Sequence, residues 1–250
     1  MAGRPEILSL AALRAMRRSR RHPRITEVDY LHLRKLIEGL RTALAEVPSP
    51  VDDILDIWCG SRPYDDLFPR GARCVGFDME DNPYGVADVA SDTFLPFPDA
   101  SFDLVVCIQA FHYMPDPAHA VAELARVLRP GGTTLVTLVF AFEYDRRLPF
   151  EGRYTEQQLR ELFSGWANVE VHEDGGRGVA WAAMTTGLLS AFEQRTSRMR
   201  PLRLLHPLFV AAYVVVNTLG LLLARGDVGS SGSAALPMNL TLTARVPSSG

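Results

Sequence analysis

The stretch FDLVVCIQAFHYMPDPAHAVAELARVLRPGGTTLVTLVF (102–140) determines the fold class. Its two ends, 102–108 and 133–140, are almost continuously apolar, as strands covered on both faces of a sheet should be. Between them, 115–132 has the spacing of an amphipathic helix, with Pro117 suited to the first helical turn. A strand, a helix and a second strand in this order form a parallel pair. The stretch therefore predicts an α/β protein with a parallel, doubly wound sheet.

The same alternation continues on both sides of this stretch. Further short apolar strands are predicted at 53–58 and 73–78, a strand followed by a turn at 167–176, and an alternating last strand at 238–246. Apolar residues at helical spacing predict further helices at 27–46, 155–166 and 181–225. The helix at 155–166 opens on Thr155 with Gln158 three residues later, which is the pattern of a capping box.

The composition is that of a globular protein with a sizeable core. The chain has 250 residues, of which 47% are apolar and 22% are charged. These values predict one large domain with an elaboration, and they exclude a disordered or fibrous chain. The net charge is −3, whereas a protein that binds nucleic acid by bulk electrostatics is expected to be basic. No nucleic-acid partner is therefore expected, and the composition does not indicate an oligomeric state.

Cysteine usage and the N-terminal residues bear on the compartment. Cys59, Cys74 and Cys107 are odd in number and lie in apolar, strand-like contexts. They predict buried free thiols and a cytoplasmic protein. Residues 1–24 are rich in arginine, and their apolar run precedes the arginines, which is the reverse of a secretory signal. We interpret them as a solvated basic helix or arm, with an organelle transit peptide as the alternative.

The stretch LFVAAYVVVNTLGLLLA (208–224) allows three interpretations. Its 17 apolar-rich residues are at the short limit for a membrane span. A span would also separate the last strand from the sheet that it should join. The helix is therefore expected to pack on the domain, with membrane-surface contact through 200–225 and a true span as the alternatives.

Polar residues follow two of the predicted strands where ligands bind in doubly wound sheets. Asp56 stands at the end of the first strand, just before a turn that contains Gly60, and Asp78 ends the second strand. Both ends lie at the carboxyl edge of a parallel sheet, where ligands bind. A carboxylate there can accept both hydroxyls of a ribose, and a glycine lets the backbone approach a ligand closely.

The runs SDTFLPFPDASFDLVVCIQAFHYMPDP (91–117) and AELARVLRPGG (122–132) resemble the class I S-adenosylmethionine-dependent methyltransferases of the small-molecule type. The resemblance covers residues 51–176. It implies a Rossmann-like fold with seven mostly parallel strands. The last strand, 238–246, is then antiparallel between 133–140 and 167–173, and a helical insertion forms a cap. It also implies S-adenosyl-L-methionine as the cofactor and a shortened first helix after CGSRPY.

The resemblance assigns roles to individual residues around the cofactor. Asp56 would help to hold the methionine ammonium, and Gly60 would lie under the methionine and ribose. Asp78 would bind the ribose hydroxyls. The remaining assignments are Met79 beside the adenine, Asp92 facing the adenine amino group, Thr93 supplying backbone contacts and Gln109 bordering the reacting methyl.

Two residues of the turn depart from the family pattern of acid-x-Gly-x-Gly-x-Gly. Trp58 and Arg62 stand where the first and third glycines are usual. Trp58 either packs against the N-terminal helix and leaves the turn unchanged, or it tilts or blocks the cofactor. We therefore count Trp58 among the cofactor-binding candidates.

Four aromatic side chains are candidates for the acceptor side of the site. His112 is the candidate general base because an ordinary histidine can take a proton from a hydroxyl near neutral pH. Tyr113 is a second catalytic candidate. Tyr30 and Tyr154, with His112, are candidates for substrate binding, although each of these residues could instead serve only packing.

The sequence as a whole favours a methyltransferase that acts on a small, hydrophobic or amphipathic acceptor such as a natural product, quinone or lipid-like molecule. The alternatives are a cofactor-binding enzyme that catalyses a cyclisation or rearrangement, and a non-enzymatic partner or membrane-surface protein with the same fold. Histidine spacing indicates no metal site. The expected division is an N-terminal cap (1–50), a cofactor-binding core (51–176), an apolar insertion ending in the loop 226–235 (177–235), and a last strand with a tail (236–250).

Overall fold

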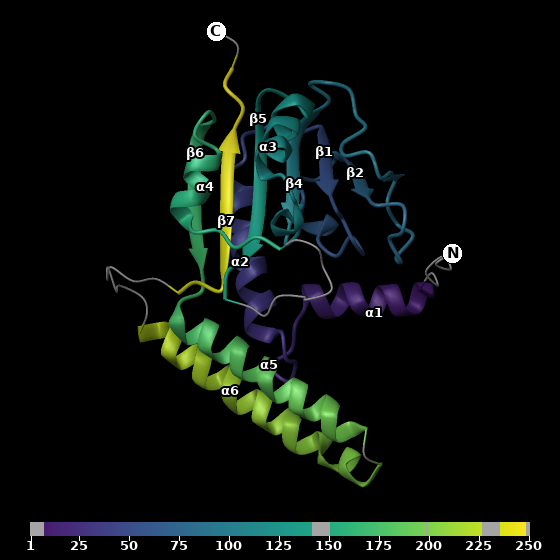
Figure 1. Ribbon diagram of the computed structural model, residues 1–250, viewed down its shortest axis with the longest axis vertical. Coiled ribbons are helices and arrows are strands. Elements are labelled where there is room, and N and C mark those ends of the chain that lie inside the picture. Colours follow the sequence, from purple (N-terminus) through teal and green to yellow (C-terminus); the bar gives the residue numbers. More distant parts are fainter. Residues whose placement is uncertain (1–7, 142–150, 199, 227–235, 249–250) are drawn as a thin grey trace.

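The computed structural model describes residues 8–141, 151–198, 200–226 and 236–248. Within this part of the chain, seven strands form one sheet in the order β3-β2-β1-β4-β5-β7-β6 (Figure 1). All neighbouring strands are parallel except for β7, which is antiparallel to both β5 and β6. The strands are β1 (Asp53–Ile57), β2 (Arg73–Asp78), β3 (Val89–Ala90), β4 (Phe102–Ile108), β5 (Leu128–Val139), β6 (Ala167–Asp174) and β7 (Asn239–Arg245). The predicted fold class and the predicted place of the last strand are confirmed.

Helices cover both faces of the sheet and gather below its carboxyl edge (Figure 1). The α-helices are α1 (Leu10–Arg21), α2 (Tyr30–Glu46), α3 (Pro117–Val127), α4 (Glu156–Leu162), α5 (Arg177–Ser197) and α6 (His206–Gly226). Three short 3-10 turns are η1 (Asp65–Leu67), η2 (Phe111–Tyr113) and η3 (Arg200–Leu205). The expected loop at 226–235 lies outside the described residues from 227 onward.

Successive residues of the central strands enter opposite cores. Leu55 and Val105 belong to the cluster under α3 and α4, whereas Ile54 and Leu104 belong to the cluster under α2. This follows from the two-residue period of a strand, and it explains why β4 is apolar at every position but Asp103. A third cluster joins Leu31 of α2 to the end of β5 and to α5.

The local signals in the sequence set several of the element boundaries. Thr155 accepts a hydrogen bond from the Gln158 amide, and the Gln158 side chain accepts one from the Thr155 amide, so the capping box is formed. Asp116 caps α3, and Pro117 occupies its first turn as expected. The helix after the glycine turn is reduced to η1, also as expected. The two-residue β3 was not among the strands predicted individually, because Val89–Ala90 is too short for an apolar pattern.

Helix α1 is the basic, largely exposed helix that the arginines predicted, and two of these arginines also bind the core. Arg17 Nε donates to the Ser61 carbonyl, and Arg21 forms an ion pair with Asp66. The helix is thus fastened to the turn after β1 and to η1, below the carboxyl edge of the sheet (Figure 1). Its basic side chains act as tethers as well as surface charge.

Helices α5 and α6 form an antiparallel hairpin that slants away from the sheet (Figure 1). The most apolar 18 residues of the segment Arg203–Gly226 have a mean hydropathy of 2.0, and among the described helices this one is long and apolar enough to cross a membrane. Asn217, which interrupts its apolar run, is buried, and its Nδ2 donates to the carbonyls of Ile25 and Glu27. Thr186 of α5 donates to the Val28 carbonyl. Both helices therefore hold the α1–α2 connection along one side.

Glycine lets the two helices of the hairpin approach closely. A Cβ at Gly220 would lie 2.5 Å from Ala182 Cβ and 2.6 Å from Leu31 Cδ1, whereas a Cβ at Gly187 would meet nothing within 4 Å. Gly220 thus lies in a close helix contact, whereas Gly187 faces open space, although both are inside helices.

We expect Gly220→Ala to lower the free energy of unfolding by about 1–3 kcal/mol, because the added methyl overpacks the contact between α5, α6 and α2. The matched control, Gly187→Ala, should be neutral or stabilising by up to about 1 kcal/mol, as alanine is the better helix former. Urea unfolding of both variants measures the difference. Equal effects of the two substitutions would contradict the close packing at Gly220.

Candidate active site

The turn after β1 adopts a left-handed backbone at three positions in alternation. Trp58, Gly60 and Arg62 have φ values of 50°, 55° and 52°. This places the Gly60 amide 2.8 Å from Asp78 Oδ2, while the Met79 amide lies 2.8 Å from Asp78 Oδ1. The carboxylate at the end of β2 is thus oriented by two backbone donors and is left with lone pairs for further donors. Trp58 and Arg62 retain the left-handed backbone that glycine adopts more readily.

Arg62 connects the turn to the segments packed around it. Its guanidinium donates to Asp65, to Asp88 and to the Cys74 carbonyl, and its side chain is 12% exposed. Burial opposes its charge, but Asp65 and Asp88 keep the pKa of Arg62 above its ordinary value. Asp88 also accepts from the Gly76 amide at 2.8 Å. One side chain in the place of a glycine therefore ties the turn to η1, β2 and the segment before β3.

Asp56 is a buried carboxyl near the same turn. Burial raises its pKa well above the ordinary value, and the charges of Asp65 and Asp78 act in the same direction, against Arg62. A buried carboxylate is costly unless a cation or hydrogen-bond donors accompany it. A positively charged group bound at the end of β1 would therefore stabilise the ionised form of Asp56.

A cavity of about 190 Å³ opens beside the turn. Its walls include Trp58, Met79, Asp92, Phe94 and Met114. The indole of Trp58 has its ring centroid 6.3 Å from that of Phe94. Trp58 therefore forms a wall of the cavity, which agrees with its place among the cofactor-binding candidates and not with the alternative of packing against the N-terminal helix.

The two predicted adenine-side residues after β3 have different surroundings. Asp92 lines the cavity, whereas Thr93 is exposed and its amide donates to Ser91 Oγ at 3.0 Å. Phe94, Met114 and His119 also line the cavity but were not singled out from the sequence. Phe94 could have been noticed as an aromatic residue directly after the predicted Asp92-Thr93 pair.

Gln109 lies in a polar cluster at the carboxyl ends of the central strands. Its backbone amide donates to Thr137 Oγ1 at 2.9 Å. In its side chain, Oε1 lies 3.3 Å from His32 Nε2, and Nε2 lies 3.5 Å from Asn239 Oδ1. His32 is buried, and burial lowers its pKa. His32 lies among the apolar positions of the helix, which predict only packing, so no sequence signal indicates its polar role.

His112 is buried in η2, immediately after β4. Neither of its ring nitrogens has a hydrogen-bond partner among the described residues, and its ring centroid lies 4.0 Å from that of Tyr113. Burial lowers the pKa of His112 to about 4, against the opposing charge of Glu151. The imidazole is therefore neutral at physiological pH, and it is a weaker base than an ordinary histidine. Tyr113 is partly exposed beside it.

Tyr154 and Tyr30 occupy different parts of the structure. Tyr154 packs against Phe111, with 6.0 Å between ring centroids, and the neighbouring Gly152 amide donates to the His112 carbonyl at 2.7 Å. Tyr154 therefore lies beside the segment that carries His112. Tyr30 instead packs with the cluster shared by α5 and β5, and its hydroxyl accepts from Arg34 at 2.8 Å. The contacts of Tyr30 are those of a packing residue.

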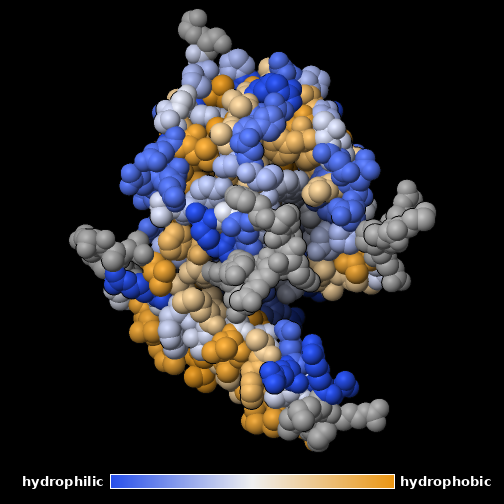
Figure 2. All heavy atoms as spheres, viewed as in Figure 1, coloured by the Kyte–Doolittle hydropathy of each residue, from blue (hydrophilic) through white to orange (hydrophobic). Residues whose placement is uncertain are grey.

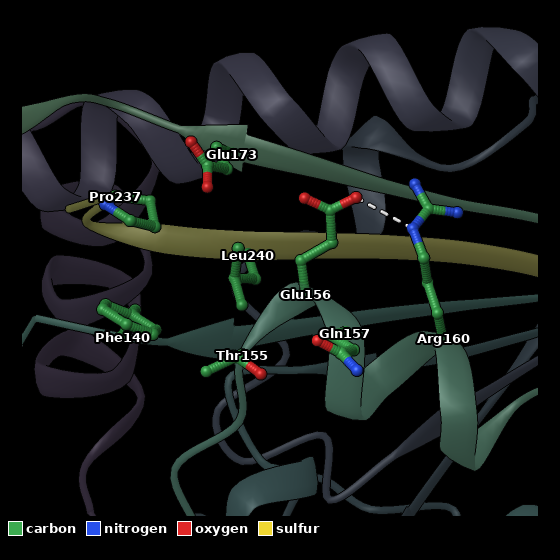
Figure 3. A pocket seen from close by; sticks show the side chains of 8 residues that line it. All are labelled: Phe140, Thr155, Glu156, Gln157, Arg160, Glu173, Pro237 and Leu240. Atoms are coloured by element: carbon green, nitrogen blue, oxygen red, sulfur yellow. Dashed lines mark hydrogen bonds and ion pairs between the residues drawn. The ribbon is translucent and has the colours of Figure 1, made fainter. Parts of the chain in front are cut away.

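A second cavity, of about 460 Å³, lies between the start of α4 and the ends of β5, β6 and β7 (Figure 3). Phe140, Pro237 and Leu240 give it an apolar part, and Glu173 and the ion pair of Glu156 with Arg160 give it a polar one. The volume falls in the range of about 300–1,000 Å³ typical of small-molecule pockets. Its lining residues include Thr155, predicted as a helix cap, but none of the catalytic, cofactor-binding or substrate-binding candidates predicted from the sequence.

The remaining titratable groups of interest are the cysteines and one surface cluster. The three cysteines are free, as predicted, and burial raises the pKa of each thiol, that of Cys74 to about 12. Cys74 is only half-buried. Glu46, Glu170 and His172 come together on the exposed surface, at the end of α2 far from the glycine turn.

The sheet order, with the glycine turn and two carboxylates at its carboxyl edge, defines a Rossmann-like α/β fold. Residues 55–136 match the family model described as a methyltransferase domain. The match covers about a third of the chain, and it makes the core of the sheet similar to this family.

Comparisons with individual proteins agree with this family. The chain is 51% identical over 60 residues to 27-O-demethylrifamycin SV methyltransferase of Amycolatopsis mediterranei, covering 24% of this chain and 21% of that protein. It is 28% identical over 157 residues to 2-methyl-6-phytyl-1,4-hydroquinone methyltransferase of Synechocystis, covering 57% and 47%. The chain thus spans between about a fifth and about half the length of these relatives. The crystal structure of the [4+2]-cyclase SpnF has the same fold, with a TM-score of 0.54, 19% identity and coverage of 85% and 82%.

We expect Arg62→Met to lower the free energy of unfolding by about 2 kcal/mol, because charged hydrogen bonds to Asp65 and Asp88 are lost. Arg62→Gly should recover part of this loss, since glycine adopts the left-handed backbone of that position without strain. Chemical denaturation of the three proteins measures both effects. An unchanged stability of Arg62→Met would show that the guanidinium does not anchor the turn.

Proposed function

We propose that the protein is an S-adenosylmethionine-dependent methyltransferase that acts on a small hydrophobic or amphipathic acceptor. The observation that carries this proposal is the Asp78 carboxylate, oriented by the amides of Gly60 and Met79 beside the 190 Å³ cavity, within a core that matches the methyltransferase family. The named relatives act on a rifamycin derivative and on a phytyl hydroquinone, which supports a small organic acceptor.

The residues present fit this cofactor. The buried Asp56 carboxyl would be compensated by the methionine ammonium, and Asp78 has lone pairs available for two ribose hydroxyls. The cavity beside Trp58 and Met79 is smaller than a complete small-molecule pocket, so it would take the adenine ring alone, with Asp92 at its rim. When bound, the cofactor supplies an activated methyl group on a sulfonium, and the protein supplies orientation and removal of water.

The acceptor would approach from the side of β5 and β7. In the strand order, β1 and β2 carry Asp56 and Asp78, β4 leads to Gln109 and His112, and the 460 Å³ cavity lies beyond, over β5, β7 and β6. The reacting methyl would then face Gln109, which is held in place by Thr137, His32 and Asn239. An acceptor in that cavity would enter past Tyr154.

The environment of His112 bears on the acceptor's chemistry. A neutral imidazole can accept a proton, but one with a pKa of about 4 is poorly matched to a weakly acidic alcohol at neutral pH. This favours acceptors that ionise readily, such as phenols and hydroquinones. His112 would hydrogen-bond the acceptor hydroxyl through a ring nitrogen, for which the described residues provide no partner.

Isothermal titration of the purified chain with S-adenosylmethionine and S-adenosylhomocysteine tests the cofactor assignment. We expect both to bind, and we expect Asp78→Ala to weaken binding at least about tenfold, because two hydrogen bonds to a charged group are lost. Asp81→Ala, an exposed neighbour in the same segment, is the matched control and should bind normally. Absence of binding to the folded wild type would refute the methyltransferase proposal. Binding without methyl transfer to any acceptor would favour the alternative of a non-methylating enzyme.

We expect the rate with a phenolic acceptor to be independent of the ionisation of His112 between about pH 5.5 and 8, because the pKa of this residue is about 4. An ordinary histidine base would instead reduce the rate as the pH falls through about 6.5. His112→Asn should lower kcat about tenfold, because the hydrogen bond that positions the acceptor hydroxyl is weakened, and less for more acidic phenols, whose hydroxyls depend less on that contact. An equal loss for all acceptors would assign His112 a purely structural role.

A further inference from the structure

Positive charge is concentrated in two segments of the chain. Residues 8–24 contain six arginines and no acidic residue, and residues 177–226 contain six arginines and one acidic residue. Together these segments carry a formal charge of +11, so the rest of a chain with net charge −3 carries −14. Both segments lie below the carboxyl edge of the sheet, where α1 and the hairpin are found (Figure 1). The positive end of the molecule is thus also the end at which the candidate active site opens.

The α5–α6 hairpin carries exposed apolar residues on the surface that does not pack against the rest of the protein. On α5, the exposed residues Trp181, Met184, Leu188 and Phe192 follow one another at helical spacing. On α6, a second exposed stripe consists of Leu208, Val215, Leu219 and Leu222. Hydrophobic residues line the outer edge of the pair in the space-filling view (Figure 2). Exposed apolar stripes of this size on a soluble protein mark a surface that binds something.

The side of the hairpin that faces the protein is fixed by polar contacts. Asn217 and Thr186, near the middle of α6 and α5, bond to the backbone of residues 25–28. The middle of the hairpin therefore cannot sit at the centre of a bilayer without drawing a polar loop in with it. This argues against a span. The single acidic residue of the hairpin, Glu193, is bonded to His206 and Tyr213 and offers little repulsion to an anionic partner.

We propose that the α5–α6 hairpin, together with the basic face of α1, binds the surface of an anionic lipid bilayer. The apolar stripes enter the interface while arginines such as Arg195 and Arg198 at the hairpin tip face the lipid headgroups. Apolar burial and attraction to anionic headgroups then act together, as in helices that lie in a membrane interface. In terms of the proposed function, on which this part rests, the acceptor is a membrane-dissolved molecule that reaches the site from the bilayer.

Vesicle flotation of the full chain, without cofactor or acceptor, tests this proposal independently of catalysis. The vesicles are phosphatidylcholine alone, or phosphatidylcholine with about one third phosphatidylglycerol. We expect binding to the anionic vesicles only, reversed at about 1 M salt, where the screening length falls to about 3 Å. Equal binding to both kinds of vesicle that salt does not reverse, or no binding to either, would overturn the proposal.

Two double variants and a matched control locate the surface. Arg195→Gln with Arg198→Gln should weaken binding about 25-fold, since each basic residue near an anionic surface contributes about fivefold. Leu188→Gln with Phe192→Gln should also weaken it strongly. Arg41→Gln with Arg70→Gln makes the same charge change at exposed sites outside α1 and the hairpin, and it should bind as the wild type does.

The same variants separate the bilayer from other occupants of the hairpin. Each variant should keep the melting temperature and the cofactor affinity of the wild type, so that a failure of the methyltransferase proposal is recognised separately. A concentration-dependent dimer abolished by Leu188→Gln with Phe192→Gln, without vesicle binding, would assign the hairpin to a second copy of the chain. Salt-sensitive RNA binding without vesicle binding would likewise overturn the proposal.

Discussion

The hydrogen bond from the Gly60 amide to the Asp78 carboxylate joins the ends of two neighbouring strands, and much of the site depends on it. It requires a left-handed turn after β1, which Gly60 supplies at its centre. It also requires that β1 and β2 end in register, which their parallel pairing ensures, with Asp56 opposite Gly76. Arg62 then holds the turn from beneath, and α1 holds it from the outer side through Ser61. The strand register, Arg62 and α1 thus all contribute to holding the turn that orients the Asp78 carboxylate.

The core of the fold could be predicted because its signals are local. A strand buried on both faces is apolar throughout, and a cap or a proline marks a helix start, so β1, β2, β4, α3 and α4 follow from short windows of sequence. The carboxyl-edge positions of Asp56 and Asp78 follow from the same reasoning. The place of β7 between β5 and β6 came from family resemblance, since its alternating pattern identifies a strand but not its neighbours.

The parts that could not be predicted depend on contacts between distant residues. His32 stands in an apolar helix, and its relation to Gln109, 77 residues away, exists only once α2 packs across the strand ends. The indole of Trp58 lies beside Phe94, a residue far from it in the sequence. The pKa of His112 depends on burial by surrounding segments, and a motif predicts the residue but not its basicity. Asn217 was visible as an interruption of an apolar run, yet its partners at residues 25 and 27 were not.

The hairpin shows why an apolar helix has to be interpreted with its topology. Considered alone, 208–224 would carry the last strand across a membrane, which contradicts the sheet. Within the hairpin, α5 leads outward and α6 returns, so both ends stay with the sheet and the topological objection disappears. The restriction comes instead from Asn217 and Thr186, which tie the middle of the hairpin to the chain between α1 and α2. Because α1 is tied in turn to the glycine turn through Arg17 and Arg21, the basic surface and the cofactor turn are linked by a short series of contacts. Any surface that engages α1 and the hairpin therefore lies against the same end of the molecule as the site, and the acceptor would have only a short distance to travel.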